Sequence, residues 1–346
     1  MKKVISIVLS LVVTAGILGG CKPSSIPKGG SEKLRIVTTI FPEYDWVREI
    51  VGDQADHIEL TMLLDDGVDL HSFQPTADDM VAISNCDVFL YTGGESDSWV
   101  EDALANASNP QRVVMNLMET LGDGVKAEEV VEGMQESEHH HGHEDAHEHH
   151  GDDDNKEEHE HHEECGHAHD DEHIWLSLKH AAVLCDAIAG TLSTVDPDHQ
   201  KAYAENAAAY IKKLNELDGR YQAVVDASPT RTLLFADRFP FRYLADDYGL
   251  TYYAAFSGCS AETEASFETV AFLAGKVDEL TLPCVLTIEG AAHGIAQTVV
   301  SNTDTKSQEI LVLDSMQSVT AGDVAAGETY LAIMEKNLET LKTALR

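Results

Sequence analysis

Four side chains that can bind a divalent cation stand in loops or at the ends of β-rich runs. His71 lies in V-D-L-H-S-F-Q-P-T and His173 in D-D-E-H-I-W-L, while Glu289 and Asp314 close the runs C-V-L-T-I-E and I-L-V-L-D. Imidazole nitrogens and carboxylate oxygens are ligands that a borderline cation such as zinc accepts. Each residue alone is a weak signal, because a lone His is often structural and an Asp after a strand often caps a helix. Their joint placement favours a metal site.

A second group of histidines is concentrated in an acidic stretch with almost no apolar residues. Twelve of the 18 histidines fall between residues 139 and 169, and residues 138–172 hold fifteen Asp or Glu against one Lys. Such a segment cannot bury enough apolar surface to offset its ordering entropy, so we expect it to be disordered without metal. The predicted accessory ligands are His139, His140, His141, His143, His147, His149, His150, His159, His161, His162, His167 and His169.

Two interpretations of this stretch compete. A solvated insertion would explain its low-complexity composition, but solubility requires no histidine. Clustered imidazoles and carboxylates bind zinc weakly at many sites. We therefore predict that the stretch collects or senses metal.

Length and charge limit the class of partner. The 346 residues exceed one typical domain core, and a hydrophobic fraction of 43% is ordinary for a folded protein, so two lobes are expected. The formal charge of -38 repels nucleic acid and anionic membrane surfaces, which makes cations the better candidates. We expect no nucleic-acid partner.

The N-terminus is typical of an exported lipoprotein. Residues 1–20 have a basic start and an apolar stretch too short for a comfortable transmembrane helix, and Leu18-Gly19-Gly20-Cys21 resembles a bacterial lipobox. An ordinary secretory signal with a chance Cys is the competing interpretation. Residues 21–33 are rich in Pro, Gly and Ser, as a flexible tether should be. We expect a chain that is exported and anchored by lipid on Cys21 to the outer face of the cytoplasmic membrane.

Five further cysteines give no clear framework. Their number is odd and they contain no C-x-x-C pair, so neither a disulfide scaffold nor a zinc knuckle is supported. Cys259 and Cys284 could form one bridge, but buried thiols are the default expectation.

Short β-rich runs alternate with amphipathic helical runs on both sides of the histidine-rich stretch. This alternation predicts parallel sheets covered by helices. The expected strands are 34–40, 57–64, 87–94, 112–117, 232–236, 251–256, 284–290 and 310–314. Helices are expected at 41–52, after Pro75 and Thr76, and at the C-terminal 327–342.

The region between the two sets of strands reads as helix. Tyr210, Leu214, Leu217, Tyr221 and Val224 recur at spacings of four and three with charges between them, which predicts a long helix. The predicted fold class is α/β, with two lobes, each a mostly parallel sheet covered by helices, joined by a long helix. The predicted domains are an N-terminal lobe at 34–175 that includes the insert 137–172, connecting helices at 176–228, and a C-terminal lobe at 229–346. Ligands of such sheets bind beyond the carboxyl ends of the strands.

Several motifs resemble the zinc and manganese solute-binding lipoproteins of bacterial ABC importers, called cluster A-I, over nearly the whole chain. They are I-F-P-E-Y-D-W-V, H-S-F-Q-P-T around His71, E-H-I-W-L-S around His173, R-F-P-F-R-Y-L-A-D-D-Y-G-L at 238–250, and L-D-S with G-E-T-Y-L-A-I-M-E-K-N-L. The resemblance implies two lobes joined by a rigid helix, a metal between them, and an acidic, histidine-rich loop that marks zinc-specific members. It also implies an ABC permease as partner and a monomeric binding protein.

The resemblance also implies a ligand set with one departure. His71 and His173 match the family's first two ligands, and Asp314 matches the carboxylate that manganese-type members use as their fourth. The family's third ligand is His or Glu, at the position where this sequence has Arg238. A guanidinium only donates and keeps its proton, so it cannot bind a cation.

The third ligand therefore stays open. Asp237, Glu262 and Glu289 are candidates, and a histidine of the acidic stretch could also reach the site. Arg238 is expected either to orient a carboxylate beside the metal or to form a salt bridge at the surface or between the lobes.

Three functions compete with zinc import. A secreted zinc hydrolase would present H-E-x-x-H on a buried helix. The match H-E-D-A-H at 143–147 has no apolar surroundings to build such a helix. The second and third candidates are a manganese-binding protein of the same family and a metal-buffering adhesin. We predict a protein that is not an enzyme and that carries zinc, with manganese as the second candidate cargo.

Overall fold

The computed structural model describes residues 33–105, 108–135, 169–260, 264–290 and 293–346. The histidine-rich stretch up to residue 168, the N-terminal segment with Cys21, and Glu262 lie outside these ranges. Within them, no helix combines the length and apolar character needed to cross a bilayer.

The first lobe is built on a four-stranded parallel sheet. Its strands are β1 (Leu34–Thr38), β2 (Ile58–Met62), β3 (Val88–Tyr91) and β4 (Val113–Asn116), in the order β2-β1-β3-β4. Apolar residues of β1 and β3 are buried because helices cover the sheet. These helices are α1 (Phe41–Val51), α2 (Ala77–Asn85), α3 (Val100–Ala105) and α4 (Leu117–Leu121). The four predicted strands and the helix after Thr76 are confirmed.

The second lobe repeats this plan. Its strands β5 (Thr232–Phe239), β6 (Thr251–Ser257), β7 (Cys284–Thr287) and β8 (Glu309–Val312) pair in parallel in the order β6-β5-β7-β8. The helices of this lobe are α7 (Arg242–Tyr248), α8 (Phe267–Leu280) and α9 (Gly294–Asn302). The predicted class of two parallel-sheet α/β lobes is therefore confirmed.

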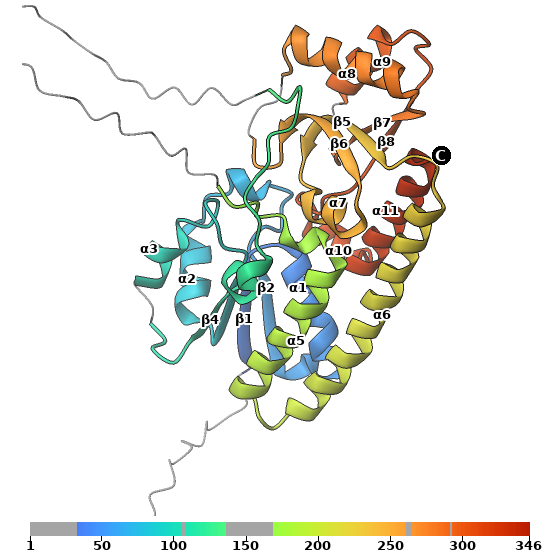
Figure 1. The fold of residues 1–346 in the computed structure, drawn as a ribbon. Coiled ribbons are helices and arrows are strands. Elements are labelled where there is room, and N and C mark those ends of the chain that lie inside the picture. Colours follow the sequence, from blue (N-terminus) through green and yellow to red (C-terminus); the bar gives the residue numbers. More distant parts are fainter. Residues whose placement is uncertain (1–32, 106–107, 136–168, 261–263, 291–292) are drawn as a thin grey trace, which may run out of the picture. The chain divides into compact units, whose positions relative to one another are not determined.

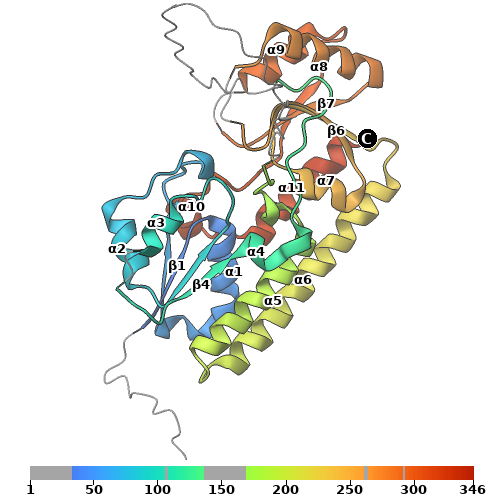
Figure 2. The same ribbon diagram turned by 60° about the vertical axis from the view of Figure 1, so that its left-hand side comes forward.

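Two helices connect the lobes. α5 (Leu178–Val195) and α6 (Gln200–Ala227) pack against each other, and α6 also contacts α1, α7 and α11 (Tyr330–Ala344) (Figures 1 and 2). The predicted apolar stripe of α6 is buried at Tyr210, Leu214, Leu217 and Tyr221. At its end Val225 is buried instead of Val224, because 3.6 residues per turn shift the stripe along a 28-residue helix.

The C-terminal segment returns to the first lobe before the chain ends. Thr320 forms an antiparallel bridge with Asp66, and the amide of Ala321 donates to the carbonyl of Asp65 at 2.7 Å. α10 (Ala321–Ala325) and α11 follow, and α11 is the closing helix predicted from the sequence. The two lobes are thus tied together at more than one point.

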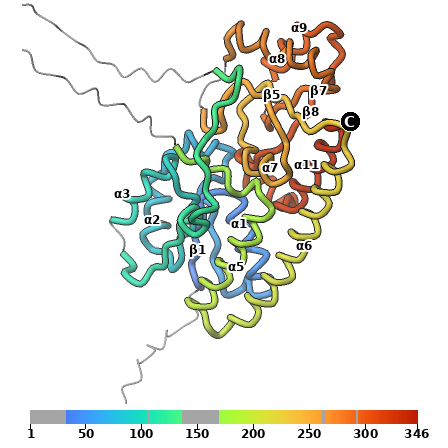
Figure 3. Tube along the Cα trace, viewed as in Figure 1, coloured from blue at the N-terminus to red at the C-terminus, as the bar shows by residue number. Residues whose placement is uncertain are grey.

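One part of the predicted N-terminal lobe lies against the second lobe. Residues 125–135, in green, run along it (Figure 3). The amide of Gln135 donates to the carbonyl of Ala255 at 2.9 Å, and the amide of Lys126 donates to the hydroxyl of Tyr243 at 3.1 Å. Residues 125–135 thus contact both the first lobe's chain and the second lobe, and the predicted domain ranges remain predictions.

Candidate metal centre

His71 lies on a short turn of 3-10 helix, Leu70–Ser72, between β2 and α2. The Asp69 side chain caps this turn by accepting from the His71 amide at 3.0 Å, and Leu70 anchors it in the core. The Nδ1 atom of His71 lies 2.8 Å from the Ser96 hydroxyl, which leaves Nε2 at the open side of the ring. The turn thus presents one imidazole nitrogen away from the first sheet, toward His173.

His173 is fully buried at the start of the Ile174–Leu176 turn that leads into α5. The Asp171 carboxylate lies 2.9 Å from both the backbone amide and Nδ1 of His173. Since a carboxylate only accepts, Nδ1 carries the hydrogen and Nε2 keeps its lone pair. A carboxylate that orients a histidine in this way is the usual partner of a metal-binding imidazole.

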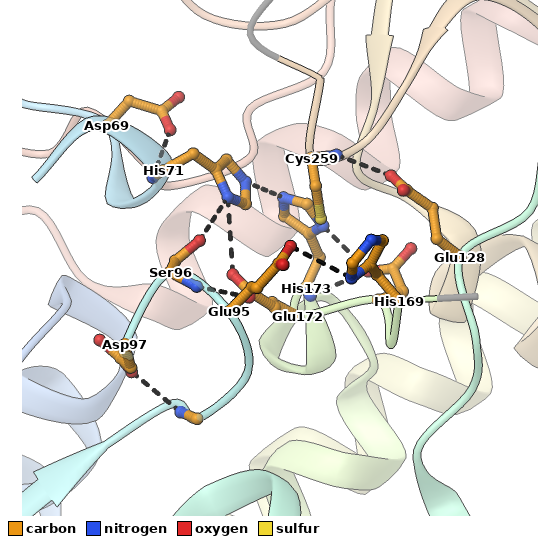
Figure 4. Close-up of polar contacts among 12 residues, drawn as sticks. Asp69, His71, Glu95, Ser96, Asp97, Glu128, His169, Glu172, His173 and Cys259 are labelled. Atoms are coloured by element: carbon orange, nitrogen blue, oxygen red, sulfur yellow. Dashed lines mark hydrogen bonds and ion pairs between the residues drawn. The ribbon is translucent and has the colours of Figure 1, made fainter. Parts of the chain in front are cut away.

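The two rings face each other through these open nitrogens (Figure 4). Nε2 of His71 and Nε2 of His173 are 3.2 Å apart, and the ring centroids are 5.1 Å apart. Two nitrogens bound to one tetrahedral zinc ion at 2.0–2.1 Å stand about 3.3 Å from each other. The separation of the pair therefore fits one zinc ion without a change of backbone.

Charges around the pair hold the two imidazoles in different states. Burial lowers the pKa of His71, and repulsion from His173 lowers it further. Burial also acts to lower the pKa of His173, but the charge and hydrogen bond of Asp171 outweigh it and raise that pKa above its ordinary value. A cation bound at both Nε2 atoms requires both imidazoles to be neutral.

Cys259 lies beside the two histidines, and sequence reasoning did not include it among the candidate ligands. His71, His173 and Cys259 each place one ligand atom within 4.8 Å of the other two. Among the described residues, no other group of three or more His, Cys, Asp or Glu side chains meets this distance. Cys259 and Cys284 are both free thiols, so the considered bridge between them is absent here. The sequence signal that could have indicated Cys259 is its position just after a strand, because Cys259 follows β6 as Asp314 follows β8.

Burial keeps the thiol of Cys259 protonated in the absence of a cation. Desolvation, and after it the charge of Glu128, raise the pKa of this thiol above its ordinary value. The same desolvation makes the position costly for an unpaired charge, so the thiolate requires a cation beside it.

Arg238 stands on β5 and turns its guanidinium toward the first lobe's chain. It lies 2.6 Å from the carboxylate of Asp69 and donates to the Ser260 carbonyl at 3.4 Å. This is the interlobe salt bridge considered for Arg238, and it joins the turn of His71 to β5, while the bond to Ser260 reaches the residue after Cys259. A positive charge thus stands beside the residue that caps the His71 turn.

The predicted carboxylate ligands lie outside the three-residue group. The Glu289 carboxylate accepts from the amides of Ser315 and Gln317 at 2.6 and 3.0 Å, so it holds the loop after β8. Asp314 accepts from the Met316 amide at 2.8 Å, and burial together with the charge of Glu289 raises its pKa. Asp314 and Glu289 as ligands therefore remain predictions.

Asp237 is also directed elsewhere. Its carboxylate accepts from its neighbour's amide, that of Arg238, at 2.9 Å, and burial raises its pKa. Asp237, Arg238, Glu289 and His293 help to line a cavity of about 760 Å³ between β5, β7 and α9. Glu262 lies outside the described residues.

The end of the predicted insert belongs to the site. Asp171 and Glu172 are each only 2% exposed, and Glu172 accepts from the Ser96 amide at 2.8 Å. Asp171 and Glu172, at the end of the predicted insert, are buried because the next residues, Ile174, Trp175 and Leu176, anchor this segment in the core. Of the twelve accessory histidines only His169 is described, and its Nδ1 lies 3.2 Å from Glu95.

Two parallel-sheet lobes bridged by helices, with candidate ligands converging where their loops meet, are the architecture of a two-lobe solute-binding protein. The chain belongs to the family described as zinc-uptake complex component A, periplasmic, whose profile matches residues 36–344. That description is of a transport component, so the prediction that the protein is not an enzyme is confirmed.

Named relatives agree with this family. The chain is 31% identical over 344 residues to the zinc-binding lipoprotein AdcA of Streptococcus pneumoniae, covering 99% of this chain and 61% of the relative. It thus spans about three fifths of the relative's length. It is 29% identical to the high-affinity zinc uptake system protein ZnuA of Bacillus subtilis, covering 97% of this chain and 94% of that one.

A solved structure shares the fold. The Zn(II)-bound ZnuA-like domain of Streptococcus pneumoniae AdcA has a TM-score of 0.66 and 27% identity, covering 91% of this chain and 99% of that domain. The predicted resemblance to metal-binding proteins of ABC importers is confirmed.

Proposed function

We propose that this chain captures one zinc ion between its lobes, with His71 and His173 as shared ligands, and carries it as cargo. The observation that supports this most strongly is the separation of 3.2 Å between the two Nε2 atoms, with Asp171 fixing the tautomer of His173. Their convergence brings together loops from distant parts of the sequence. A site of this kind forms only in the folded protein.

Zinc is favoured over manganese by the donors and by the relatives. Nitrogen ligands suit zinc, while manganese prefers carboxylate and carbonyl oxygens. The relatives named above are described as zinc-binding or zinc-uptake proteins. Asp314, which follows β8, is the predicted fourth ligand.

Delivery to a membrane permease is the part of the proposal that the family match supports. The ion passes from the loaded protein to an ABC permease in the cytoplasmic membrane, and the protein acts as a monomer. Lipid attached to Cys21 holds the chain on the outer face of that membrane, so diffusion of the loaded protein is limited to the surface where the permease lies.

The histidine-rich segment acts as an accessory collector. We expect its members to be weak ligands, because a segment so poor in apolar residues would lose entropy in wrapping each ion, whereas the Nε2 atoms of His71 and His173 already lie 3.2 Å apart. His169, at the end of the segment, pairs with Glu95, next to the Ser96 that holds His71. Ions released by the segment are thus delivered beside the site.

Calorimetry with zinc tests the site in a chain that lacks residues 138–168. The deletion ends there because a longer one would remove Asp171 and Glu172, which hold the two histidines. His71→Ala and His173→Ala should each weaken tight binding by orders of magnitude. His57→Ala, which changes an exposed histidine of the first lobe, should not. Unchanged affinity in both site variants refutes the proposal.

A further inference from the structure

We propose that Cys259 supplies a thiolate as the third ligand of this site, so that two imidazoles and one sulfur hold the cargo. The inference rests on the proposed function and extends it. The ligand atoms of His71, His173 and Cys259 already lie within 4.8 Å of one another. A tetrahedral zinc ion requires nitrogen and sulfur ligands about 3.6 Å apart, so the sulfur needs to approach by no more than about 1.2 Å.

The backbone before Cys259 is shaped to bring it against His173. Gly258 lies so close to the ring that an added Cβ would stand 3.0 Å from Cε1 of His173 and 3.0 Å from the carbonyl oxygen of Phe239. A side chain at this position would require these neighbours to give way by a few tenths of an ångström. The Cys259 amide donates to the Glu128 carboxylate at 2.9 Å, which fixes the loop from the other side.

A second buried group points to a cation at the same place. Glu172 is 2% exposed, yet its Oε2 atom has no hydrogen-bond partner among the described residues and lies 3.5 Å from Nδ1 of His71. An unpaired buried carboxylate oxygen is costly unless positive charge lies nearby. A cation held by His71 supplies that charge through the imidazole.

Arg238 explains why a sulfur is needed. Its guanidinium stands where relatives are expected to place a ligand, and it is bound to Asp69 at 2.6 Å. It therefore adds a positive charge near the site and contributes no donor atom. A thiolate at Cys259 provides the missing donor and a negative charge that offsets Arg238. When the ion binds, the sulfur–hydrogen bond breaks and the proton leaves to solvent.

The ligand set has a consequence for selectivity. Thiolate is a soft ligand that zinc accepts readily, whereas manganese prefers oxygen. A site of two imidazoles and one thiolate therefore discriminates between these cations by its chemistry. Zinc preference would then lie in the site itself and not only in the histidine-rich segment.

Cobalt(II) spectroscopy tests the proposal directly, because a thiolate bound to cobalt gives an intense sulfur-to-metal charge-transfer band in the near ultraviolet. The parent is the chain from residue 22 onward with Cys165→Ser, which removes the thiol of the histidine-rich segment. One equivalent of cobalt should give the band. Cys259→Ala and Cys259→Ser should abolish it, while Cys284→Ala, a change at another thiol of the second lobe, should preserve it.

Zinc and manganese titrations provide the second readout. Cys259→Ala should weaken zinc roughly 100-fold and manganese less than about tenfold, and Cys259→His should recover zinc binding without the band. A parent without the band, or a band that persists in Cys259→Ala, overturns the proposal. If His71→Ala abolishes tight zinc and Cys259→Ala does not, the cleft site stands and only the sulfur ligand fails. If neither change matters, both proposals fail.

Discussion

Asp171 should tune the affinity of the site although its carboxylate is directed at His173 and not at the cargo. Its carboxylate lies 2.9 Å from Nδ1 of His173, so it fixes the tautomer and makes Nε2 a better ligand. Loss of such a partner typically costs 10–100-fold in metal affinity, or about 1.4–2.7 kcal/mol. Because both groups are buried, solvent screens this interaction little.

Two substitutions separate charge from geometry. Asp171→Asn keeps an oxygen that accepts from His173, so zinc affinity should fall by roughly tenfold. Asp171→Ala removes the acceptor and should cost roughly 100-fold. Competition with a fluorescent zinc chelator measures both, in the chain that lacks residues 138–168. Asp170→Asn, a change at the exposed neighbour, is the matched control.

The order of the three affinities decides the outcome. Zinc affinity should decrease from the parent to the Asn variant and again to the Ala variant, with all three chains folded by circular dichroism. Equal affinity in the parent and Asp171→Ala would mean that Asp171 does not orient a metal ligand, and the assignment of His173 Nε2 as the donor would be refuted.

Three further changes have defined outcomes. Gly258→Ala should lower the unfolding free energy by about 1–3 kcal/mol and weaken zinc binding, because the new methyl group displaces the His173 ring. An unchanged unfolding free energy in denaturation and an unchanged zinc affinity in titration would contradict this. Deletion of residues 138–168 should lower the zinc stoichiometry by native mass spectrometry to about one tight ion with affinity kept within roughly tenfold, and loss of that ion would show that the segment supplies a ligand. Burial raises the pKa of Glu43 to about 7, so the stabilising effect of its protonated form is present below about pH 4.5 and is lost as pH rises through 7. Urea unfolding between pH 5 and 8 measures the difference in unfolding free energy between the parent and Glu43→Gln. This difference should change by about 3 kcal/mol over that range, and a constant difference would contradict the prediction.

The helices and strands could be predicted from the sequence because each depends on the pattern of neighbouring residues. All eight strands were predicted from alternating β-rich runs, and the buried face of α6 followed from the spacing of Tyr210, Leu214, Leu217 and Tyr221. The end of that stripe was wrong by one residue. The helix turns once every 3.6 residues, so a spacing of four and three drifts off the buried face over 28 residues.

The site was only partly predictable. His71 and His173 lie side by side, and both could be selected from the sequence because each stands in a motif of the family. Cys259 was missed because its role depends on a loop after β6 that Gly258 allows to approach His173, a contact between residues far apart in the sequence that no local pattern records. Asp171 and Glu172 were assigned to the insert because acidic composition cannot reveal burial, which the following apolar turn imposes.

The most direct test of the central claim is anomalous diffraction at the zinc edge from crystals of the protein loaded with one equivalent of zinc. We expect one strong peak within about 2.1 Å of Nε2 of both His71 and His173, with the Cys259 sulfur about 2.3 Å away. A tight zinc ion located elsewhere, with the two imidazoles still facing each other without metal, would contradict it.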